Sequence, residues 1–492
     1  YKDGLIHVFK GIPYGADTST TRFRAPAAPQ AWSGERDATK YGAQSPQIYG
    51  NPPDAWLFTS WANPQKESED CLFVNVWTPG VRDTKRRPVM VWIHGGGFGA
   101  GSGSDHGYDG TRLATRGDVV VVTVNHRLNV FGYLYLGQFG SQFADSGNAG
   151  QLDLIAALHW VRDNIAEFGG DPDNVLIFGE SGGGAKICTL MAMPAAKGLF
   201  HRAVVQSGPM IWCTPTDRAS RTARQALGTL GITAQNLQAL KSVSTAQLLQ
   251  ALAGLNELGT AGTLAPVVDG RNLPSHPFDP VASAVSAHVP LLIGFNHTET
   301  TTILAVRDNF NISWQELPAR IKPNIGDLDA QLVVDQFRRA NPGASPSDLY
   351  FEVTTLAMMT RSVLRVADAK SAQHAAQLWM YEVTWETPVN GARWGSPHAF
   401  EIGLVFDNVA KSESLYGRNN PEAQKVADQM SEAWIAFARH GNPGTPVLPK
   451  WPAYEPKQRP VMQFNVVSGV ANNPMGPGIE ILKNAPYWDL TK

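Results

Sequence analysis

Residues 174–183 read Asn-Val-Leu-Ile-Phe-Gly-Glu-Ser-Gly-Gly, an apolar run that stops at a glycine-rich turn. The run predicts a short buried strand, and the apolar spacing after Ser181 predicts a helix. A strand, a sharp turn of the form Gly-x-Ser-x-Gly and a helix together make a nucleophile elbow, which holds a serine hydroxyl exposed above a sheet. Ser181 is therefore the candidate nucleophile.

This turn has two other interpretations. A serine that only caps the helix explains Ser181 but not three glycines in the first helical turn, each of which costs about 1 kcal/mol relative to alanine. A phosphate-binding loop also follows a strand and is rich in glycine. The chain contains neither G-x-x-x-x-G-K-[ST] nor G-x-G-x-x-G, so the nucleophile is favoured.

A second glycine run follows an upstream strand. His94-Gly95-Gly96-Gly97-Phe98 begins where the apolar run 88–93 ends. Such a run lets backbone N–H groups converge on one point, where they stabilise the oxyanion of a tetrahedral intermediate. Gly96, Gly97 and the N–H of Gly182 are the candidate donors. Phe98, at the end of the loop, is a candidate substrate-binding residue.

Short apolar, β-branched runs recur along the chain and predict strands buried on both faces. They cover residues 88–93, 118–124, 175–178, 203–205, 290–295 and 378–383. Helical patterns such as 150–166 lie between them, so an α/β fold is predicted, with a mostly parallel central sheet and helices on both faces. The segments at about 210–285 and 312–376 are expected to be helical excursions over the carboxyl edge of that sheet, within one domain spanning residues 1–492.

Composition excludes some classes of function. The 492 residues are 43% hydrophobic and 17% charged, with a net charge of −2, so neither nucleic acid nor a membrane is expected as a partner. No stretch of about 18 apolar residues occurs. The three cysteines have no spacing typical of zinc, and no metal or cofactor is expected. The sequence begins with Tyr1, which suggests a removed leader and slightly favours a periplasmic or secreted location over the cytoplasm.

Chain order restricts the partners of Ser181, because acid and base follow the nucleophile in that order in this architecture. Of the three late histidines, His374 falls in helical sequence and His440 at a helix end. His398 lies in a loop beyond the strand 378–383 and is the candidate base. For the acid, Glu299 follows the strand 290–295, and Asp269 is its rival, although an aspartate in Val267-Val268-Asp269-Gly270 also fits a β-turn.

The chain resembles the type-B carboxylesterase family over nearly its whole length. The residues that carry the resemblance are Phe9 to Tyr14, Ser68 to Leu72, Asn125 to Arg127 with Phe131-Gly132, Phe168 to Pro172, Gly179 to Gly182, Gln206 to Gly208 and His398 to Glu401. The resemblance implies the α/β-hydrolase fold and a Ser-His-Glu triad, so it favours Glu299 over Asp269. It also implies a supporting role for Glu180 beside the nucleophile and a hydrogen bond from Ser207 near the acid.

The resemblance further implies an ion pair between Glu69 and Arg127. Some positions depart from the family pattern. Gly182 stands where alanine is common, which should leave the oxyanion donor intact, and residues 14–18 replace an expected proline-rich stretch. Cys71 matches a cysteine that is usually bonded to one upstream, where this chain has Ser45. That disulfide is expected to be absent.

Hydrolysis of a small carboxylic ester through an acyl-serine intermediate is the function predicted. A carbamate or amide hydrolase with the same triad is the nearest alternative, and a catalytically silent binding protein is a third. A narrower hypothesis concerns the charge of the substrate. It rests on His297 and Arg393, which are close in sequence to the proposed acid and base, and on Lys186 in the helix after Ser181. If they line the mouth of the site, esters that carry a carboxylate would be favoured by electrostatic steering. The oligomeric state is not predicted.

Overall fold

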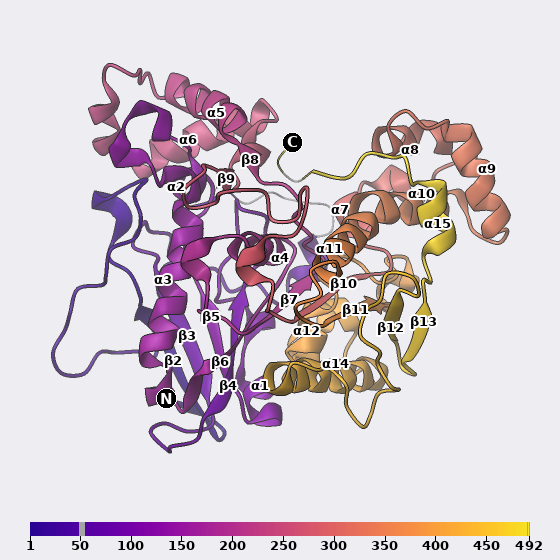
Figure 1. Cartoon of the computed structure of the whole chain (residues 1–492), viewed down its shortest axis with the longest axis horizontal. Helices are drawn as coiled ribbons and strands as arrows, with labels where there is room; N and C mark the ends of the chain where they lie inside the picture. Colours follow the sequence, from indigo (N-terminus) through magenta and orange to yellow (C-terminus); the bar gives the residue numbers. More distant parts are fainter. Residues whose placement is uncertain (49–54, 490, 492) are drawn as a thin grey trace.

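A large mixed sheet forms the centre of the molecule (Figure 1). The computed structural model describes residues 1–48, 55–489 and 491. In this part of the chain the sheet has 11 strands in the order β1-β2-β3-β5-β4-β6-β7-β10-β11-β12-β13. These strands are β1 (Lys2–Asp3), β2 (Ile6–Pro13), β3 (Phe73–Thr78), β4 (Arg87–Ile93), β5 (Val120–Val124), β6 (Gly170–Glu180), β7 (Arg202–Gln206), β10 (Leu291–Asn296), β11 (Leu378–Val383), β12 (Pro460–Phe464) and β13 (Gly469–Asn472).

Pairing is parallel from β5 through β4, β6, β7, β10 and β11 to β12, and antiparallel at both ends of the sheet. The predicted mostly parallel α/β sheet is confirmed. Each predicted strand is present, and β6 is longer than expected because Gly170 already pairs with Arg87 of β4. A separate short ribbon pairs β8 (Thr214–Pro215) with β9 (Val267–Val268).

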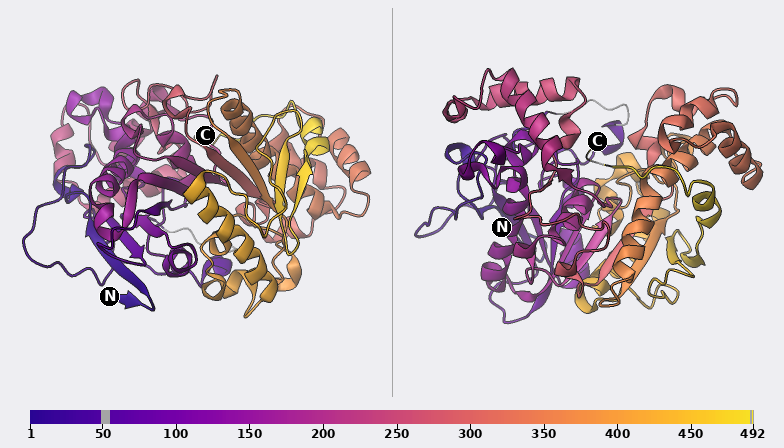
Figure 2. Two further views of the ribbon diagram at one scale, coloured as in Figure 1. Left: turned by 60° about the horizontal axis from the view of Figure 1, so that its bottom comes forward. Right: turned by 45° about the horizontal axis from the view of Figure 1, so that its top comes forward.

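Helices cover both faces of the sheet (Figure 2, left). One face is covered by α3 (Ala149–Asn164), α4 (Gly182–Leu190) and α11 (Arg361–Ser371), and the other by α1 (Thr111–Gly117), α12 (Ile402–Val405) and α14 (Pro421–His440). Side chains alternate along each strand: Val89 and Val91 of β4 enter the first core, whereas Met90 and Trp92 enter the second. Burial on both faces explains why these strands read as continuous apolar runs.

Two groups of helices project at one end of the molecule (Figure 1, upper left and upper right). The first contains α5 (Thr216–Thr229) and α6 (Thr245–Glu257), which pack against each other. The second contains α8 (Leu317–Ile325), α9 (Ala330–Ala340) and α10 (Pro346–Thr355), with a small core of their own that includes α15 (Gly476–Ile481). Shorter helices are α2 (Asn129–Tyr133), α7 (Thr300–Ile303) and α13 (Glu413–Tyr416). In the described residues, no helix combines the length and the apolar character needed to cross a membrane.

Candidate active site

The sheet register brings the chemically important loops to one edge. Ile93 of β4 is level with Gly179 of β6, and Glu180 is level with Gln206 of β7. Gly294 of β10 is also level with Gln206, and β11 continues the same parallel register. The carboxyl ends of β4, β6, β7, β10 and β11 therefore meet, which is where ligands bind in open α/β sheets.

Ser181 stands in a strained turn at this edge. Its φ of 55° and ψ of −122° lie outside the regions that serine normally adopts. The turn is held because the Ser181 N–H donates to the carbonyl of Gln206 at 2.8 Å, and the Ser181 carbonyl accepts from Ala185 at 3.0 Å. The hydroxyl makes no capping hydrogen bond to α4, so the capping interpretation of Ser181 does not account for it.

The flanking glycines are required by close backbone contacts. A Cβ added at Gly179 would lie 2.5 Å from the carbonyl oxygen of Ile93, and one at Gly183 would lie 2.0 Å from the same atom. A Cβ at Gly208, in the loop after β7, would meet the Ser181 carbonyl at 2.1 Å. These distances are far below van der Waals contact, so only glycine lets β4, β6 and the start of α4 approach this closely.

The loop after β4 presents backbone donors to the same point. Gly96 and Gly97 both have positive φ, 81° and 58°, which turns their N–H groups out of the line of the strand. Within the described residues, the N–H groups of Gly96, Gly97 and Gly182 donate to no protein acceptor. All three residues line the cavity that contains Ser181. Three free donors beside a serine are the arrangement that an oxyanion needs.

Gly96→Ala is expected to reduce kcat about 10²- to 10³-fold, with a much smaller change in KM. Gly96 has a φ of 81°, and a Cβ there would lie 2.4 Å from the carbonyl oxygen of Ala100, so the loop must shift and its N–H groups no longer point at the oxyanion. Gly254→Ala in α6 is the control, because its Cβ would meet nothing closer than 3.6 Å. The kcat and KM of both variants are measured on one ester, and an unimpaired Gly96→Ala enzyme would contradict this role of the loop.

His398 and Glu299 form the centre of a buried hydrogen-bond network. The His398 Nδ1 lies 2.5 Å from Glu299 Oε2. The other carboxylate oxygen, Oε1, accepts the Ser207 hydroxyl at 2.6 Å and the Asn296 N–H at 2.7 Å. Glu299 is completely buried. Because both of its oxygens are engaged, Glu299 fixes the orientation of the imidazole ring and leaves Nε2 as the reactive nitrogen.

Glu180 approaches His398 from the other side. Its Oε1 lies 3.2 Å from His398 Nε2. Burial would lower the pKa of His398, but the carboxylates of Glu180 and Glu299 outweigh it and raise the pKa to about 10. Burial raises the pKa of Glu180 well above its ordinary range, and the positive charge of His398 opposes this shift. No hydrogen bond joins Ser181 to His398 among the described contacts, and such bonds commonly tighten only when substrate is present.

Glu180→Gln is expected to move the acid limb of the kcat/KM profile to lower pH by about one unit. A general base must be unprotonated, so activity is lost as pH falls through the pKa of His398. Removing the Glu180 carboxylate removes one cause of the raised pKa, which lowers the pH at which activity is lost. Profiles from pH 7 to 11 measure the shift, with Glu352→Gln as a carboxylate control outside the network. An acid limb that stays in place or moves upward would contradict the assignment.

Sequence reasoning assigned no role to Glu401, although it is completely buried next to the triad. Its Oε2 accepts the Asn296 side-chain amide at 2.6 Å, and its Oε1 lies within 3.3 Å of the Gln206 amide nitrogen. The carboxylate therefore holds the two strand ends, β7 and β10, that carry Ser207 and Glu299. Its position three residues after His398 was the available signal.

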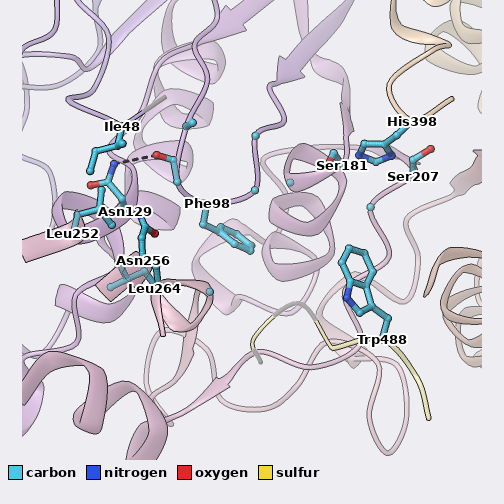
Figure 3. Close-up of a pocket in the computed structure, with 18 of the residues that line it drawn as sticks. Ile48, Phe98, Asn129, Ser181, Ser207, Leu252, Asn256, Leu264, His398 and Trp488 are labelled. Atoms are coloured by element: carbon cyan, nitrogen blue, oxygen red, sulfur yellow. Dashed lines mark hydrogen bonds between the residues drawn. The ribbon is translucent and has the colours of Figure 1, made fainter. Parts of the chain in front are cut away.

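Two cavities meet at Ser181. The smaller has a volume of 310 Å³ and is lined by Phe98, Leu252, Leu264 and Trp488 among others (Figure 3). Ser181 and His398 lie at one end of it, whereas the residues from α6 and the segment after it lie at the other. The larger cavity, of 840 Å³, opens on the side of Trp61, Asp105 and Tyr108. Ser181, Gly96 and His398 line both, so a substrate bound across them would present its reacting carbonyl between the two spaces.

Comparison with known proteins identifies the family to which this chain belongs. The sequence model of the carboxylesterase family matches residues 1–475. The chain belongs to the carboxylesterase family. It is a serine carboxylesterase of the α/β-hydrolase fold, and the resemblance noted in the sequence is confirmed.

Individual relatives agree with this assignment. The chain is 37% identical to the para-nitrobenzyl esterase of Bacillus subtilis over 95% of its own length and 93% of that protein. It is 32% identical to a fumonisin B1 esterase of Sphingopyxis macrogoltabida, covering 94% of the chain and 84% of the relative. A carboxylesterase from Geobacillus stearothermophilus is similar in structure, with a TM-score of 0.85 at 37% identity and coverage of 98% and 97%.

Three charged residues considered for substrate binding do not line either cavity of this carboxylesterase. His297 Nδ1 pairs with the buried Glu382 at 2.7 Å, in a separate cavity of 260 Å³. Arg393 is exposed, and its guanidinium stacks 4.0 Å from the centre of the Phe310 ring. Lys186 is completely buried behind the glycine loop, where it donates to the carbonyl of His94 at 2.9 Å. Phe98 does line the smaller cavity.

The ion pair between Glu69 and Arg127 implied by the resemblance is not formed. Arg127 instead makes a buried pair with Asp153 of α3, with Nη2 2.6 Å from Oδ1, because its side chain turns toward that helix. Glu69 pairs with Arg22 at 2.5 Å and also accepts the Thr245 hydroxyl at the start of α6. Each charge finds a nearer partner, so the predicted pair is corrected to two separate ones.

The remaining candidates take structural positions. Asp269 accepts the N–H groups of Arg271 and Leu273 in a turn after β9. His374 follows the end of α11, and His440 is the last residue of α14. Cys71, Cys188 and Cys213 are all buried and free. Among the described residues, no group of His, Cys, Asp and Glu has the arrangement of a metal site.

Proposed function

We propose that this enzyme hydrolyses carboxylic esters through an acyl-serine intermediate, with Ser181 as nucleophile, His398 as general base and Glu299 as the acid that orients it. The observation that carries the proposal is the position of Ser181, in a strained turn between free backbone donors and a histidine whose other nitrogen is fixed by a buried glutamate. This arrangement is the one that nucleophilic acyl transfer requires.

In the first half of the reaction, the Ser181 Oγ attacks the ester carbonyl carbon while its proton passes to His398 Nε2. The carbonyl oxygen becomes an oxyanion that accepts hydrogen bonds from Gly96, Gly97 and Gly182. Collapse of this intermediate breaks the carbon–oxygen bond to the alcohol. His398 returns the proton to the departing oxygen, so the products of this half are a neutral alcohol and an ester of Ser181.

In the second half, water takes the place of the alcohol and gives a proton to His398 Nε2 as its oxygen attacks the acyl carbon. The second tetrahedral intermediate collapses by expelling Ser181 Oγ, which takes the proton back. The carboxylic acid leaves and the enzyme is regenerated. Glu299 stays ionised throughout and stabilises the imidazolium in both halves, while Glu180 supports the cation from the opposite side.

Labelling with a fluorophosphonate tests the nucleophile. The probe is expected to modify Ser181, identified by peptide mass spectrometry, with loss of hydrolysis in proportion to labelling. Ser207 is the internal control, because it lines the same cavity but its hydroxyl is committed to Glu299. Modification of Ser207, or undiminished labelling of Ser181→Ala, would overturn the assignment.

The bond class is tested with substrates that share one acyl group. A p-nitrophenyl ester is expected to exceed the matching p-nitroanilide in kcat/KM by at least about 10³-fold, because an amide leaving group must be protonated earlier in the reaction. The kcat/KM for the matching N-alkyl carbamate is measured in the same way. A higher kcat/KM for the anilide or the carbamate than for the ester would show that the enzyme is an amide or carbamate hydrolase instead of an ester hydrolase.

A further inference from the structure

A buried lysine lies directly beneath the glycine loop. Lys186 is in α4, one helical turn after Gly182, and its side chain is completely buried. Its Nζ donates to the carbonyl of His94 at 2.9 Å and lies 5.8 Å from the centre of the Phe98 ring. His94 and Phe98 stand at the two ends of the loop that carries two of the oxyanion donors. The ammonium group is therefore enclosed between the end of β4, the glycine loop and α4.

The ammonium of Lys186 has no counter-ion among the described residues. It forms no ion pair there, and its hydrogen-bond acceptor is the His94 carbonyl. Burial lowers the pKa of Lys186 to about 7, and the more distant carboxylate of Glu180 opposes this shift in part. A cation that has lost water without gaining a counter-ion is stabilised strongly by any negative charge that forms close by.

Two histidines also interact with Lys186, from the loops after β4 and β5, and both are neutral. Burial and the nearby lysine lower the pKa of His94 to about 3, and they hold the pKa of His126 well below its ordinary value. The two imidazole rings stack with their centres 4.9 Å apart. Arg127, which follows His126, is neutralised by Asp153. Among these groups, Lys186 alone carries a positive charge without a counter-ion.

The negative charge that this cation lacks develops during the reaction on the other side of the loop. The carbonyl that accepts from Lys186 would lie 3.1 Å from a Cβ at Gly183, the residue beside the oxyanion donor Gly182. Phe98, whose ring lies next to the ammonium, lines the cavity that contains Ser181. One layer of backbone therefore separates the ammonium from the oxyanion. A charge pair that forms only in the transition state lowers the activation barrier without tightening the binding of substrate.

We propose that Lys186 is a positioning residue for the oxyanion hole, and that its ammonium acts in two ways. Its hydrogen bond to the His94 carbonyl fixes the base of the glycine loop, and its positive charge stabilises the oxyanion through that loop. Lys186 lines neither cavity that contains Ser181, so it touches no substrate and transfers no proton. The inference rests on the acyl-serine mechanism proposed above and adds a charge to the backbone donors of that mechanism.

Two substitutions separate the hydrogen bond of Lys186 from its charge. Lys186→Gln keeps a neutral N–H donor for the His94 carbonyl, whereas Lys186→Met keeps only the apolar stem. Both variants are expected to reduce kcat for a p-nitrophenyl ester about 10- to 100-fold, with KM changed less than about threefold. The constants are compared at the pH of maximum wild-type activity. Wild-type kcat in either variant would overturn the proposal.

Thermal stability distinguishes this role of Lys186 from a purely structural one. Replacing an unpaired buried cation by an apolar side chain removes its desolvation cost, so Lys186→Met is expected to melt at the wild-type temperature or above it. A structural role requires the opposite, a lower melting temperature together with the lost activity, and that result would overturn the proposal.

Lys370→Met is the matched control. Lys370 is also almost completely buried, and its Nζ donates to the carbonyls of Ser286 and Ala287 at 2.7 Å. It belongs to α11 and lines neither cavity that contains Ser181. Loss of this second buried ammonium is expected to leave kcat within about twofold of wild type. A loss of kcat equal to that of Lys186→Met would show that any buried lysine has this effect, and would overturn the proposal.

A ketone inhibitor measures the effect of the charge on the oxyanion itself. The carbonyl carbon of a trifluoromethyl ketone bonds to Ser181 Oγ while the serine proton passes to His398, which leaves a hemiketal oxygen in the oxyanion hole. Titration by NMR with a ¹³C-labelled carbonyl gives the pKa of this hemiketal. Removing a nearby cation disfavours the ionised oxygen, so Lys186→Gln is expected to raise the hemiketal pKa by about 1 to 2, and Lys370→Met is expected to leave it unchanged.

The outcomes separate this inference from the function on which it rests. If the wild type neither hydrolyses the ester nor forms the ketone adduct at Ser181, the proposed function is overturned. If the wild type does both, and the Lys186 variants keep the wild-type hemiketal pKa, the role of Lys186 alone is overturned.

Discussion

Ser181→Ala is expected to reduce kcat about 10⁵- to 10⁶-fold while leaving the fold intact. The hydroxyl supplies the attacking oxygen, and no other group in the cavity can replace it, because Ser207 is bound to Glu299. Alanine tolerates φ = 55° no better and no worse than serine, so the strain of the turn is unchanged. Burst and steady-state assays with a p-nitrophenyl ester, together with the melting temperature, measure both parts of this expectation.

Ser181→Gly supplies the control for strain. Glycine adopts this backbone region without a Cβ penalty, so this variant is expected to be about 1 kcal/mol more stable than Ser181→Ala and equally inactive. Retention of more than a hundredth of wild-type kcat in either variant would show that another residue attacks the ester.

Glu299→Gln is expected to reduce kcat about 10⁴-fold. The side chain keeps its size and can still accept the Ser207 hydroxyl and the Asn296 N–H, so the loop should stay in place. An amide nitrogen facing Nδ1, however, stabilises the tautomer of His398 that carries its proton on Nε2, where it cannot accept one from Ser181. The neutral amide also no longer stabilises the imidazolium. Pre-steady-state acylation rates report this loss directly.

Asp269→Asn is the matched control, since this residue was the rival acid in the sequence. Its carboxylate closes a turn through the backbone of Arg271 and Leu273, so kcat is expected to stay within about threefold of wild type, consistent with a position outside the network of buried polar groups. If Asp269→Asn lost most of its kcat while Glu299→Gln stayed active, Asp269 would be the acid of the triad and Glu299 would not.

The sheet could be predicted because its physical signal is local. Strands such as 88–93 and 378–383 are buried on both faces, so they appear as uninterrupted apolar runs whatever their neighbours are. Their order in the sheet is not local information. The placement of β5 between β3 and β4, out of chain order, depends on packing that no single segment specifies.

The core of the candidate site was also accessible, because Ser181, the glycine loop and His398 each follow a strand at its carboxyl end. Closeness in sequence to these residues did not predict which other side chains reach the site. His297 is two residues before Glu299, yet its side chain leaves the loop in another direction and meets Glu382 of the neighbouring strand. Lys186 does not line the mouth of the site, because the helix turns its side chain under the glycine loop.

The partners of Glu69 and Arg127 were beyond sequence reasoning for a different reason. Arg22 and Asp153 could not be chosen from among many possible partners without knowing which helices pack near them. Such pairings are set by tertiary distances rather than by residue patterns.

The order of strands on one side of the sheet bears on how the enzyme is made. From β6 onward, the strands β7, β10, β11 and β12 join the sheet in the order in which they leave the ribosome. Domains generally fold as units during synthesis, so the sheet is completed only after the last of these strands has been translated. His398 comes after β11, when the nucleophile and the glycine loop have long been translated. A nascent chain therefore carries Ser181 without its base and gains hydrolytic power only near the end of synthesis.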